Sequence, residues 1–130
     1  KKPPKPFTIS GTGKQVRDVL FIDDFCELVL ISIKKFNSIK NQTFCIGGGK
    51  KNQVDLRKLT SLCQKVTKNK IKIKRIKKTS IYDIPYFVSK NAKAKRLLNW
   101  KPRTNIKDKK SKTYNWINGN KKLIKRYYNE

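Results

Sequence analysis

Histidine and methionine are absent from this 130-residue chain, and cysteine occurs only three times. The lack of histidine excludes a Ser/His/Asp arrangement and removes a principal zinc ligand. Cys26, Cys45 and Cys63 are odd in number and form no Cys-x-x-Cys pair, so they indicate neither a disulfide framework nor a zinc site. We therefore expect three small buried side chains in a protein of the reducing cytoplasm.

Acidic residues are also scarce, because 8 Asp and Glu stand against 34 Lys and Arg and leave a net charge of +26. Repulsion among the lysines opposes compaction, so we expect the isolated chain to be marginally stable and to have a partner. The same charge would attract polyanions without specificity. No apolar run approaches the roughly 20 residues of a membrane span, and the length allows one domain only.

Groups that could carry out chemistry are few. The chain has no Gly-x-x-x-x-Gly-Lys-Ser/Thr loop for a phosphate, and no carboxylate pair has a spacing typical of an acid/base dyad. Asp23 and Asp24 are adjacent, so their side chains diverge, which favours the capping of a helix over acid/base work. We expect no catalytic residue, no metal ligand and no cofactor-binding residue in this chain.

Short strand and helix patterns alternate along the chain and predict a mixed α/β fold. The predicted strands are residues 7–10, 19–22, 43–46, 71–78 and 86–88, and the glycines at 47–49 end the third of these and leave room for a close approach. The predicted helices begin at Asp23 or Asp24, run over 56–68 after Asp55 as N-cap, run over 92–98, and begin at Thr104 or Asn105. The basic tail is expected to fray.

Three segments occur in a specific order: TISGTGKQVRDVLFIDD, FCIGGG and SIYDIPYFVSKNAKAKRLLNWKP. Their order and their residues resemble the C-terminal half of the extended short-chain dehydrogenase/reductase family, the nucleotide-sugar epimerases and dehydratases. The resemblance implies an incomplete Rossmann-type α/β fold with short strands and three or four helices. It implies a C-terminal nucleotide-sugar-binding part over residues 1–118, followed by a basic tail over 119–130.

The resemblance also implies four substrate-binding residues. Arg17 would hold the substrate diphosphate, Asp83 would accept hydrogen bonds from the ribose, and Thr8 and Ser10 would lie beside the base. Ser80 stands where the family has a second arginine, which would weaken binding unless another cation substitutes. Three alternatives stay open: Arg17 could be a surface residue paired with Asp18, Asp83 a turn residue before a proline, and the strand of Thr8 and Ser10 a sheet element only.

The resemblance further implies NAD, bound by an N-terminal half that supplies the glycine-rich turn and the catalytic Tyr-x-x-x-Lys pair, neither of which we expect from this chain. That half, a CDP-sugar substrate and a second copy in a homodimer are the implied partners. In the family the 43–46 strand joins the sheet of the cofactor-binding half, so it would be unpaired here.

Within the family, GKQVRDVL, FCIGGG and KPFTISG are most similar to the 2-epimerases of CDP-paratose and CDP-tyvelose, enzymes of O-antigen synthesis. Those enzymes oxidise and re-reduce C2 of the sugar, and this chain alone is expected to be inactive. Nucleotide-sugar 4-epimerases and 4,6-dehydratases remain alternatives. A basic nucleic-acid-binding protein is another, because IKIKRIKK, Trp100, Trp116 and the tail tyrosines combine cations with aromatic rings.

Overall fold

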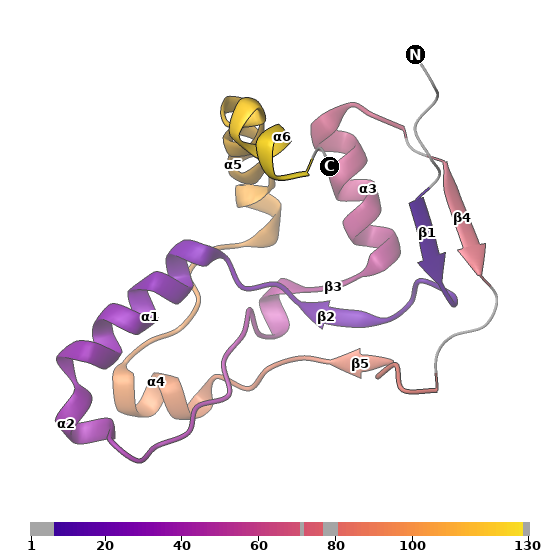
Figure 1. Cartoon of the computed structure of the whole chain (residues 1–130). Coiled ribbons are helices and arrows are strands. Elements are labelled where there is room, and N and C mark those ends of the chain that lie inside the picture. Colours follow the sequence, from indigo (N-terminus) through magenta and orange to yellow (C-terminus); the bar gives the residue numbers. More distant parts are fainter. Residues whose placement is uncertain (1–6, 71, 77–80, 129–130) are drawn as a thin grey trace.

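The computed structural model describes residues 7–70, 72–76 and 81–128. Its elements follow in this order: β1 (Phe7–Ser10), β2 (Val16–Asp18), α1 (Ile22–Lys34), α2 (Phe36–Ile39), a 3-10 turn (Lys50–Asn52), β3 (Gln53–Asp55), α3 (Leu56–Thr67), β4 (Ile73–Ile76), β5 (Tyr86–Phe87), α4 (Ala92–Leu98), α5 (Ile106–Gly119) and α6 (Lys121–Tyr128). The mixed α/β fold predicted from the sequence is confirmed (Figure 1).

The strands form two small sheets. β1 and β4 run parallel in one, and β2 is the central strand of the other, antiparallel to β3 and parallel to β5. Figure 1 shows α3 beside β2 and β3, with α5 and α6 next to α3, whereas α1, α2 and α4 gather at the opposite end. The chain passes from β1 to β2 through a turn in which Gly11 and Gly13 have φ angles of 67° and 70°. Glycine adopts this left-handed backbone without a side-chain clash.

The core lies between α1 and α4. Leu28, Ala94, Leu98 and Trp100 are buried there, and Trp100 is 2% exposed. The Trp100 indole nitrogen donates to the carbonyl oxygen of Asp24 at 3.1 Å, which satisfies the one polar group of this large side chain. The chain segment that leaves α4 is thereby fastened to α1.

Two of the predicted strands are absent. Residues 19–22 leave the sheet, because β2 ends at Asp18 and α1 already begins at Ile22. Residues 43–46 form irregular chain, and Phe44 and Ile46 pack their side chains against the α1/α4 core. A run of apolar residues satisfies its burial equally well in a strand or in a loop that crosses a core, so the pattern alone does not separate the two. The other predicted strands are confirmed within the described residues, although those at β4 and β5 are shorter than predicted.

The predicted helices are confirmed in position but not in all their caps, and the structure adds α2 and α6 to the three or four helices expected. Asp55 caps α3 as predicted, with its carboxylate accepting from the Lys58 amide at 2.7 Å. Asp23 and Asp24 cap nothing, because Phe21 is the N-cap of α1. Asp24 instead accepts from the Thr104 amide at 3.0 Å. The tail does not fray within the described residues but forms α6, where an apolar face can lie against α5.

All three cysteines are exposed, so their predicted burial is wrong. Cys26 lies on the solvent side of α1, Cys45 lies in the loop that replaces the predicted strand, and Cys63 lies on α3. The core is too small to cover them, since Val54 and the four core residues named above are the buried apolar residues among those that the structure describes. Exposure of large apolar side chains is correspondingly high, and Ile22, Leu30 and Ile33 on α1 are 60% to 66% exposed.

Candidate functional site

Arg17 lies in the middle of β2, opposite Val54 of β3 and Phe87 of β5. The loop that contains Gly11 and Gly13 leads into this strand, and the first residues of α3 hold that loop in place. The Arg57 amide donates to the Gly13 carbonyl at 3.3 Å, and the Arg57 Nε donates to the Thr12 carbonyl at 2.7 Å. Arg17 is therefore presented by backbone that is held on both sides.

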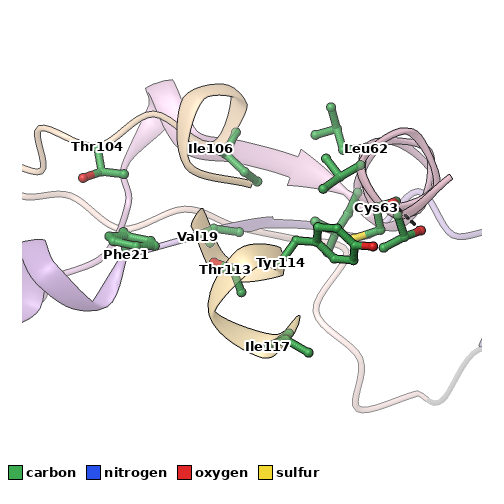
Figure 2. A pocket seen from close by; sticks show the side chains of 12 residues that line it. Val19, Phe21, Leu62, Cys63, Thr104, Ile106, Thr113, Tyr114 and Ile117 are labelled. Atoms are coloured by element: carbon green, nitrogen blue, oxygen red, sulfur yellow. Dashed lines mark hydrogen bonds between the residues drawn. The ribbon is translucent and has the colours of Figure 1, made fainter. Parts of the chain in front are cut away.

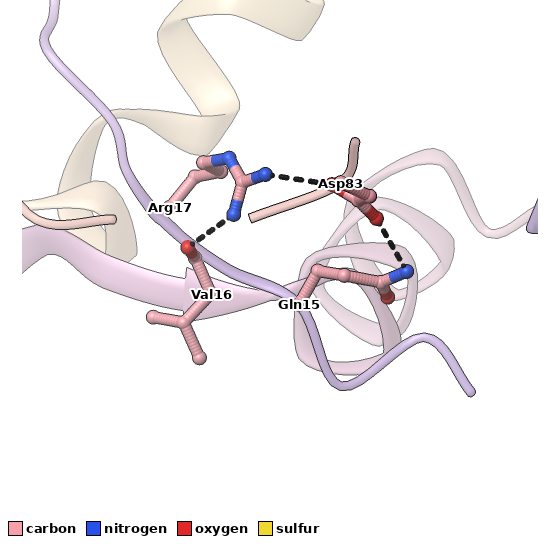
Figure 3. A network of polar contacts seen from close by, with 4 residues as sticks. All are labelled: Gln15, Val16, Arg17 and Asp83. Carbon is pink, nitrogen blue, oxygen red and sulfur yellow. Dashed lines mark hydrogen bonds and ion pairs between the residues drawn. The ribbon is translucent and has the colours of Figure 1, made fainter. Parts of the chain in front are cut away.

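The Arg17 guanidinium forms an ion pair with Asp83, with 2.9 Å between Nη2 and Oδ1 (Figure 3). Gln15 donates to the other carboxylate oxygen of Asp83 at 2.8 Å. Arg17 Nη1 also donates to the Val16 carbonyl at 2.8 Å, which holds the guanidinium close to the strand. Asp83 lies within reach of Arg17 because the Val16 amide donates to the Pro85 carbonyl at 3.0 Å. This hydrogen bond holds the segment before β5 alongside β2.

Both charged side chains remain accessible to a ligand. The Arg17 side chain is 43% exposed and the Asp83 side chain 28% exposed. Asp83 uses one hydrogen bond on each oxygen, and a carboxylate can accept about four. Arg17 retains guanidinium N–H groups beyond those that contact Asp83 and Val16. The pair thus places a hydrogen-bond donor for a phosphate, the Arg17 guanidinium, next to an acceptor for a hydroxyl group, the Asp83 carboxylate.

Asp18 has a different role from Arg17, although the two are neighbours in sequence. Its Oδ2 accepts from the Gly49 amide at 2.7 Å and from the Ser89 amide at 3.1 Å. Adjacent side chains of a strand point to opposite faces, so Asp18 cannot reach the guanidinium of Arg17 while serving these amides. The alternative in which Arg17 pairs with Asp18 is therefore wrong.

The glycines at 47–49 are needed for close packing within the chain. A Cβ at Gly48 would lie 2.0 Å from the Val19 carbonyl oxygen, and one at Gly47 would lie 2.3 Å from the Ser89 Oγ. Asn91 accepts from the Gly47 amide at 3.1 Å and donates to its carbonyl at 2.9 Å. The room left by these glycines is filled by the protein itself, and their amides at 47 and 49 already donate to Asn91 and Asp18.

The remaining predicted site residues are placed only in part. Thr8 and Ser10 lie in β1, opposite Lys74 and Ile76 of β4, so this strand does pair in a sheet. Their side chains lie outside what the structure describes, as does Ser80. The chain runs from Ser10 through the glycine turn to Gln15 and Arg17, which connects β1 directly to the Arg17 and Asp83 pair.

Tyr86 and Lys90 have the Tyr-x-x-x-Lys spacing, so the expectation that this spacing is absent from the chain is wrong. The structure separates the two residues functionally. Tyr86 begins β5 and its hydroxyl donates to Gln53 at 2.7 Å, whereas Lys90 lies in irregular chain ahead of α4. Side chains four residues apart meet on one face of a helix, and no helix joins these two. Their spacing therefore does not create an acid/base pair.

Sequence reasoning missed Gln15, Asn52 and Asn91. Gln15 stands two residues before Arg17, and the period of two in extended chain could have placed both on one side. Asn52 is 3% exposed, donates to the Thr104 carbonyl at 2.7 Å and accepts from the Ile106 amide at 3.0 Å. No pattern in the sequence marks Asn52, because Thr104 and Ile106, two of the partners of its side chain, lie more than fifty residues away.

A separate apolar cavity of about 250 Å³ lies between α3 and α5 (Figure 2). Apolar side chains and hydroxyl groups line it, together with Cys63 and Tyr114. Neither Arg17 nor Asp83 contributes to it, so the charged pair and the cavity are distinct features.

The described residues hold neither a cluster of metal ligands nor a membrane-spanning helix. No group of three or more His, Cys, Asp or Glu residues there could hold a metal ion. No helix in the same stretches is both long and apolar enough to cross a membrane.

No protein-family model matches the chain. The chain is 33% identical over 112 residues to the CDP-paratose 2-epimerase of Salmonella typhi, a match that covers 86% of this chain. It is 31% identical over 121 residues to the UDP-glucuronate 4-epimerase of Thermodesulfobacterium geofontis, which covers 93% of this chain. Among solved structures, UDP-glucuronic acid 4-epimerase from Bacillus cereus, in complex with UDP-glucuronic acid and NAD, superposes over 88% of this chain with a TM-score of 0.77 and 25% identity.

The chain is a relative of the extended short-chain dehydrogenase/reductase epimerases. It spans about a third of the length of the relatives it matches, 33% and 36% of the two sequences and 36% of the Bacillus cereus enzyme. An epimerase from Methanothermobacter thermautotrophicus shares the fold as well, with a TM-score of 0.78 at 19% identity. The resemblance deduced from the three ordered segments is thus confirmed at the level of the epimerase family and its α/β fold.

Proposed function

We propose that this chain forms the nucleotide-sugar-binding part of an NAD-dependent sugar epimerase. Residues 1–118 would be the C-terminal nucleotide-sugar-binding part, and residues 119–130 a basic tail. The observation that carries the proposal is the contact of Arg17 with Asp83, because it joins a guanidinium and a carboxylate from distant segments at an accessible surface.

In this proposal Arg17 binds the diphosphate and Asp83 binds the ribose. A guanidinium forms paired, charge-assisted hydrogen bonds with phosphate oxygens, and a carboxylate accepts from vicinal hydroxyls. Before a ligand arrives, the two residues neutralise each other and Gln15 holds the carboxylate. Binding would turn the Arg17 N–H groups toward the diphosphate, while Asp83 keeps its Gln15 contact. Thr8 and Ser10 would contribute through β1 beside the base.

The glycine turn at residues 47–49 does not fit the pyrophosphate of NAD. A dinucleotide pyrophosphate is bound by free backbone amides of a glycine-rich turn. The candidate turn at residues 47–49 directs its Gly47 and Gly49 amides to Asn91 and Asp18, and a Cβ at Gly48 would collide with the Val19 carbonyl. The proposal assigns NAD, and with it the hydride transfer at the sugar, to the N-terminal half of such an enzyme. A cytoplasmic location and a homodimer of the assembled enzyme belong to the same proposal.

For substrate we propose a CDP-sugar, with CDP-paratose and CDP-tyvelose interconverted at C2. The similarity to the Salmonella typhi enzyme supports this choice, whereas the similarity to UDP-glucuronate 4-epimerases makes a UDP-sugar the competing substrate. Calorimetric titration of the chain with CDP and with UDP separates the two. Tighter binding of CDP supports the 2-epimerase assignment, and tighter binding of UDP replaces it by a 4-epimerase assignment.

The site itself is tested by the same titration with Arg17→Ala. Loss of a charged hydrogen bond costs about 1.5 to 3 kcal/mol, so nucleotide affinity should fall by about ten- to a hundredfold. The matched control is Arg103→Ala, which removes the same charge from an exposed pair with Glu27. Equal losses in both variants would mean that net charge alone binds the nucleotide, and would refute the site.

A basic nucleic-acid-binding function is the competing proposal, and the net charge of +26 supports it. The prediction that Trp100 contributes to such binding is wrong, because Trp100 is 2% exposed and cannot stack on a base. Trp116 and Tyr127 are exposed, at 58% and 73%, while part of the IKIKRIKK segment lies outside the described residues. Binding of mixed oligonucleotides that is independent of sequence and falls steeply with salt, without competition from CDP, would favour this function.

A further inference from the structure

The proposed function leaves the helical hairpin of α5 and α6 without a role. The two helices contact each other and lie beside α3 (Figure 1), and Lys112 of α5 forms an ion pair with Asp23 of α1. They enclose an open hollow of about 730 Å³ that is lined by Trp116, Ile117, Leu123, Ile124 and Tyr127. Trp116 is 58% exposed, Leu123 47% and Tyr127 73%. An aromatic and aliphatic surface is thus open to solvent in a chain rich in charge.

The residues of α6 separate by chemistry around the helix. A helix turns by about 100° per residue, so Lys121, Lys122, Lys125 and Arg126 fall within one arc of roughly 140°. Leu123, Ile124 and Tyr127 fall on the opposite side. The four cations are all exposed, and none of them is in an ion pair within the described residues. The segment is amphipathic, with a basic face and an apolar face.

We propose that the α5/α6 hairpin binds the surface of an anionic lipid bilayer. Trp116, Leu123 and Tyr127 would enter the headgroup region, and the basic face of α6 would contact the lipid phosphates. A basic face opposite an apolar face that includes aromatic rings is the composition of helices that lie in the plane of a membrane surface. The eight residues of α6 span only about 12 Å, so the hairpin rests on the surface and does not cross it.

The charge pattern favours this site over the other exposed apolar helix. α1 exposes Ile22, Leu30 and Ile33, yet its first two turns contain Asp23, Asp24 and Glu27. Asp23 is paired with Lys112 and Glu27 with Arg103, so the exposed apolar residues of α1 are not accompanied by a cluster of unpaired cations there. Apolar exposure is combined with a cluster of cations on α6, where each basic residue near an anionic surface strengthens binding by about fivefold.

The test is flotation of the full chain with vesicles of phosphatidylcholine alone or mixed with phosphatidylglycerol, because flotation separates bound protein from aggregates. We expect flotation with the mixed vesicles only. Replacing Lys121, Lys122, Lys125 and Arg126 by Gln should weaken partitioning by about a hundredfold or more. The matched control replaces Lys50, Lys51, Lys95 and Lys101 by Gln, removes four charges as well, and should retain most of the binding.

Insertion is tested separately from charge. Leu123→Ser with Tyr127→Ser should reduce partitioning, whereas Leu30→Ser with Ile33→Ser, an equally exposed pair on α1, should not. Brominated lipids should quench Trp116, and Trp116→Phe should abolish the quenching, because buried Trp100 is then the only tryptophan. Circular dichroism confirms that each variant is folded.

Three results would overturn the proposal. The wild-type chain could fail to float with anionic vesicles. The two charge variants could lose affinity equally, which would assign binding to net charge. Finally, the Leu123 and Tyr127 substitutions could leave vesicle binding unchanged while the α6 charge variant loses affinity for oligonucleotides. That combination would assign the hairpin to nucleic acid. None of these outcomes bears on nucleotide binding at Arg17, so the two proposals fail independently.

Discussion

Arg17 and Asp83 stand 66 residues apart in the sequence, and 2.9 Å separates the guanidinium Nη2 from the carboxylate Oδ1. The contact joins β2 to the turn before β5, and Gln15 completes it from the same side. It therefore has a structural role as well as the proposed role in binding, and the two can be measured separately.

Asp83→Asn should lower the free energy of unfolding by less than about 1 kcal/mol, because both partners are partly exposed and solvent screens the pair. The variant keeps an oxygen that can accept from Gln15 or Arg17. Urea unfolding provides the measurement, with Glu27→Gln in the more exposed Arg103 pair as the control. A loss of more than about 3 kcal/mol for Asp83→Asn would show that this contact is a buried ion pair in solution.

Gly48→Ala should destabilise the chain severely, by more than about 2 kcal/mol, because its Cβ would meet backbone atoms of Val19 at 2.0 Å and 2.6 Å. Backbone cannot move aside as a flexible side chain can. Gly119→Ala is the matched control, since nothing lies within 4 Å of its added Cβ and alanine favours the helix. The two changes in urea midpoint should differ in sign or at least in size. Equal effects would contradict the close approach at Gly48.

Asn52→Ala should cost about 2 to 4 kcal/mol, because it removes the partners of the Thr104 carbonyl and the Ile106 amide at a buried position. These contacts begin α5, so hydrogen exchange of the α5 amides should rise more than that of α3. The exposed Asn37→Ala serves as control and should change stability by less than about 0.5 kcal/mol. Uniform loss of protection across the chain would argue against a local junction.

Asp55→Ala should lower stability by about 0.5 to 2 kcal/mol through loss of the α3 N-cap, whereas Asp55→Asn should preserve most of it. Asparagine can still accept from the Lys58 amide. Thermal unfolding followed by circular dichroism distinguishes the two variants. If Asp55→Asn were as harmful as Asp55→Ala, charge and not the cap hydrogen bond would be responsible.

The isolated chain should unfold with a free energy below about 5 kcal/mol and gain stability as salt is added. Its buried apolar core is small, and a net charge of +26 opposes compaction until it is screened. Urea titrations at low and high sodium chloride give both quantities. A midpoint that falls with added salt would show that ion pairs outweigh lysine repulsion.

The sequence by itself determined the order of the epimerase-like segments, the helix after Asp55 and the strand at residues 7–10, because each of these rests on local chemistry. An aspartate before an amphipathic run caps a helix wherever it occurs, and glycines at 11 and 13 permit a left-handed turn in any fold. The sequence leaves a contact between the neighbours Arg17 and Asp18 open, because β2, the strand that directs their side chains to opposite faces, is not among the predicted strands.

Only the tertiary structure decided the partners of the polar side chains and the fate of the apolar runs. Aspartate is a common helix cap, yet Asp24 accepts from the Thr104 amide, because the segment that follows α4 returns to α1. Residues 19–22 and 43–46 have strand composition, yet β2 is already paired on both sides by β3 and β5. The cysteines are exposed because the core between α1 and α4 closes around other side chains. These outcomes depend on contacts between segments far apart in the chain, and local propensity carries no information about such contacts.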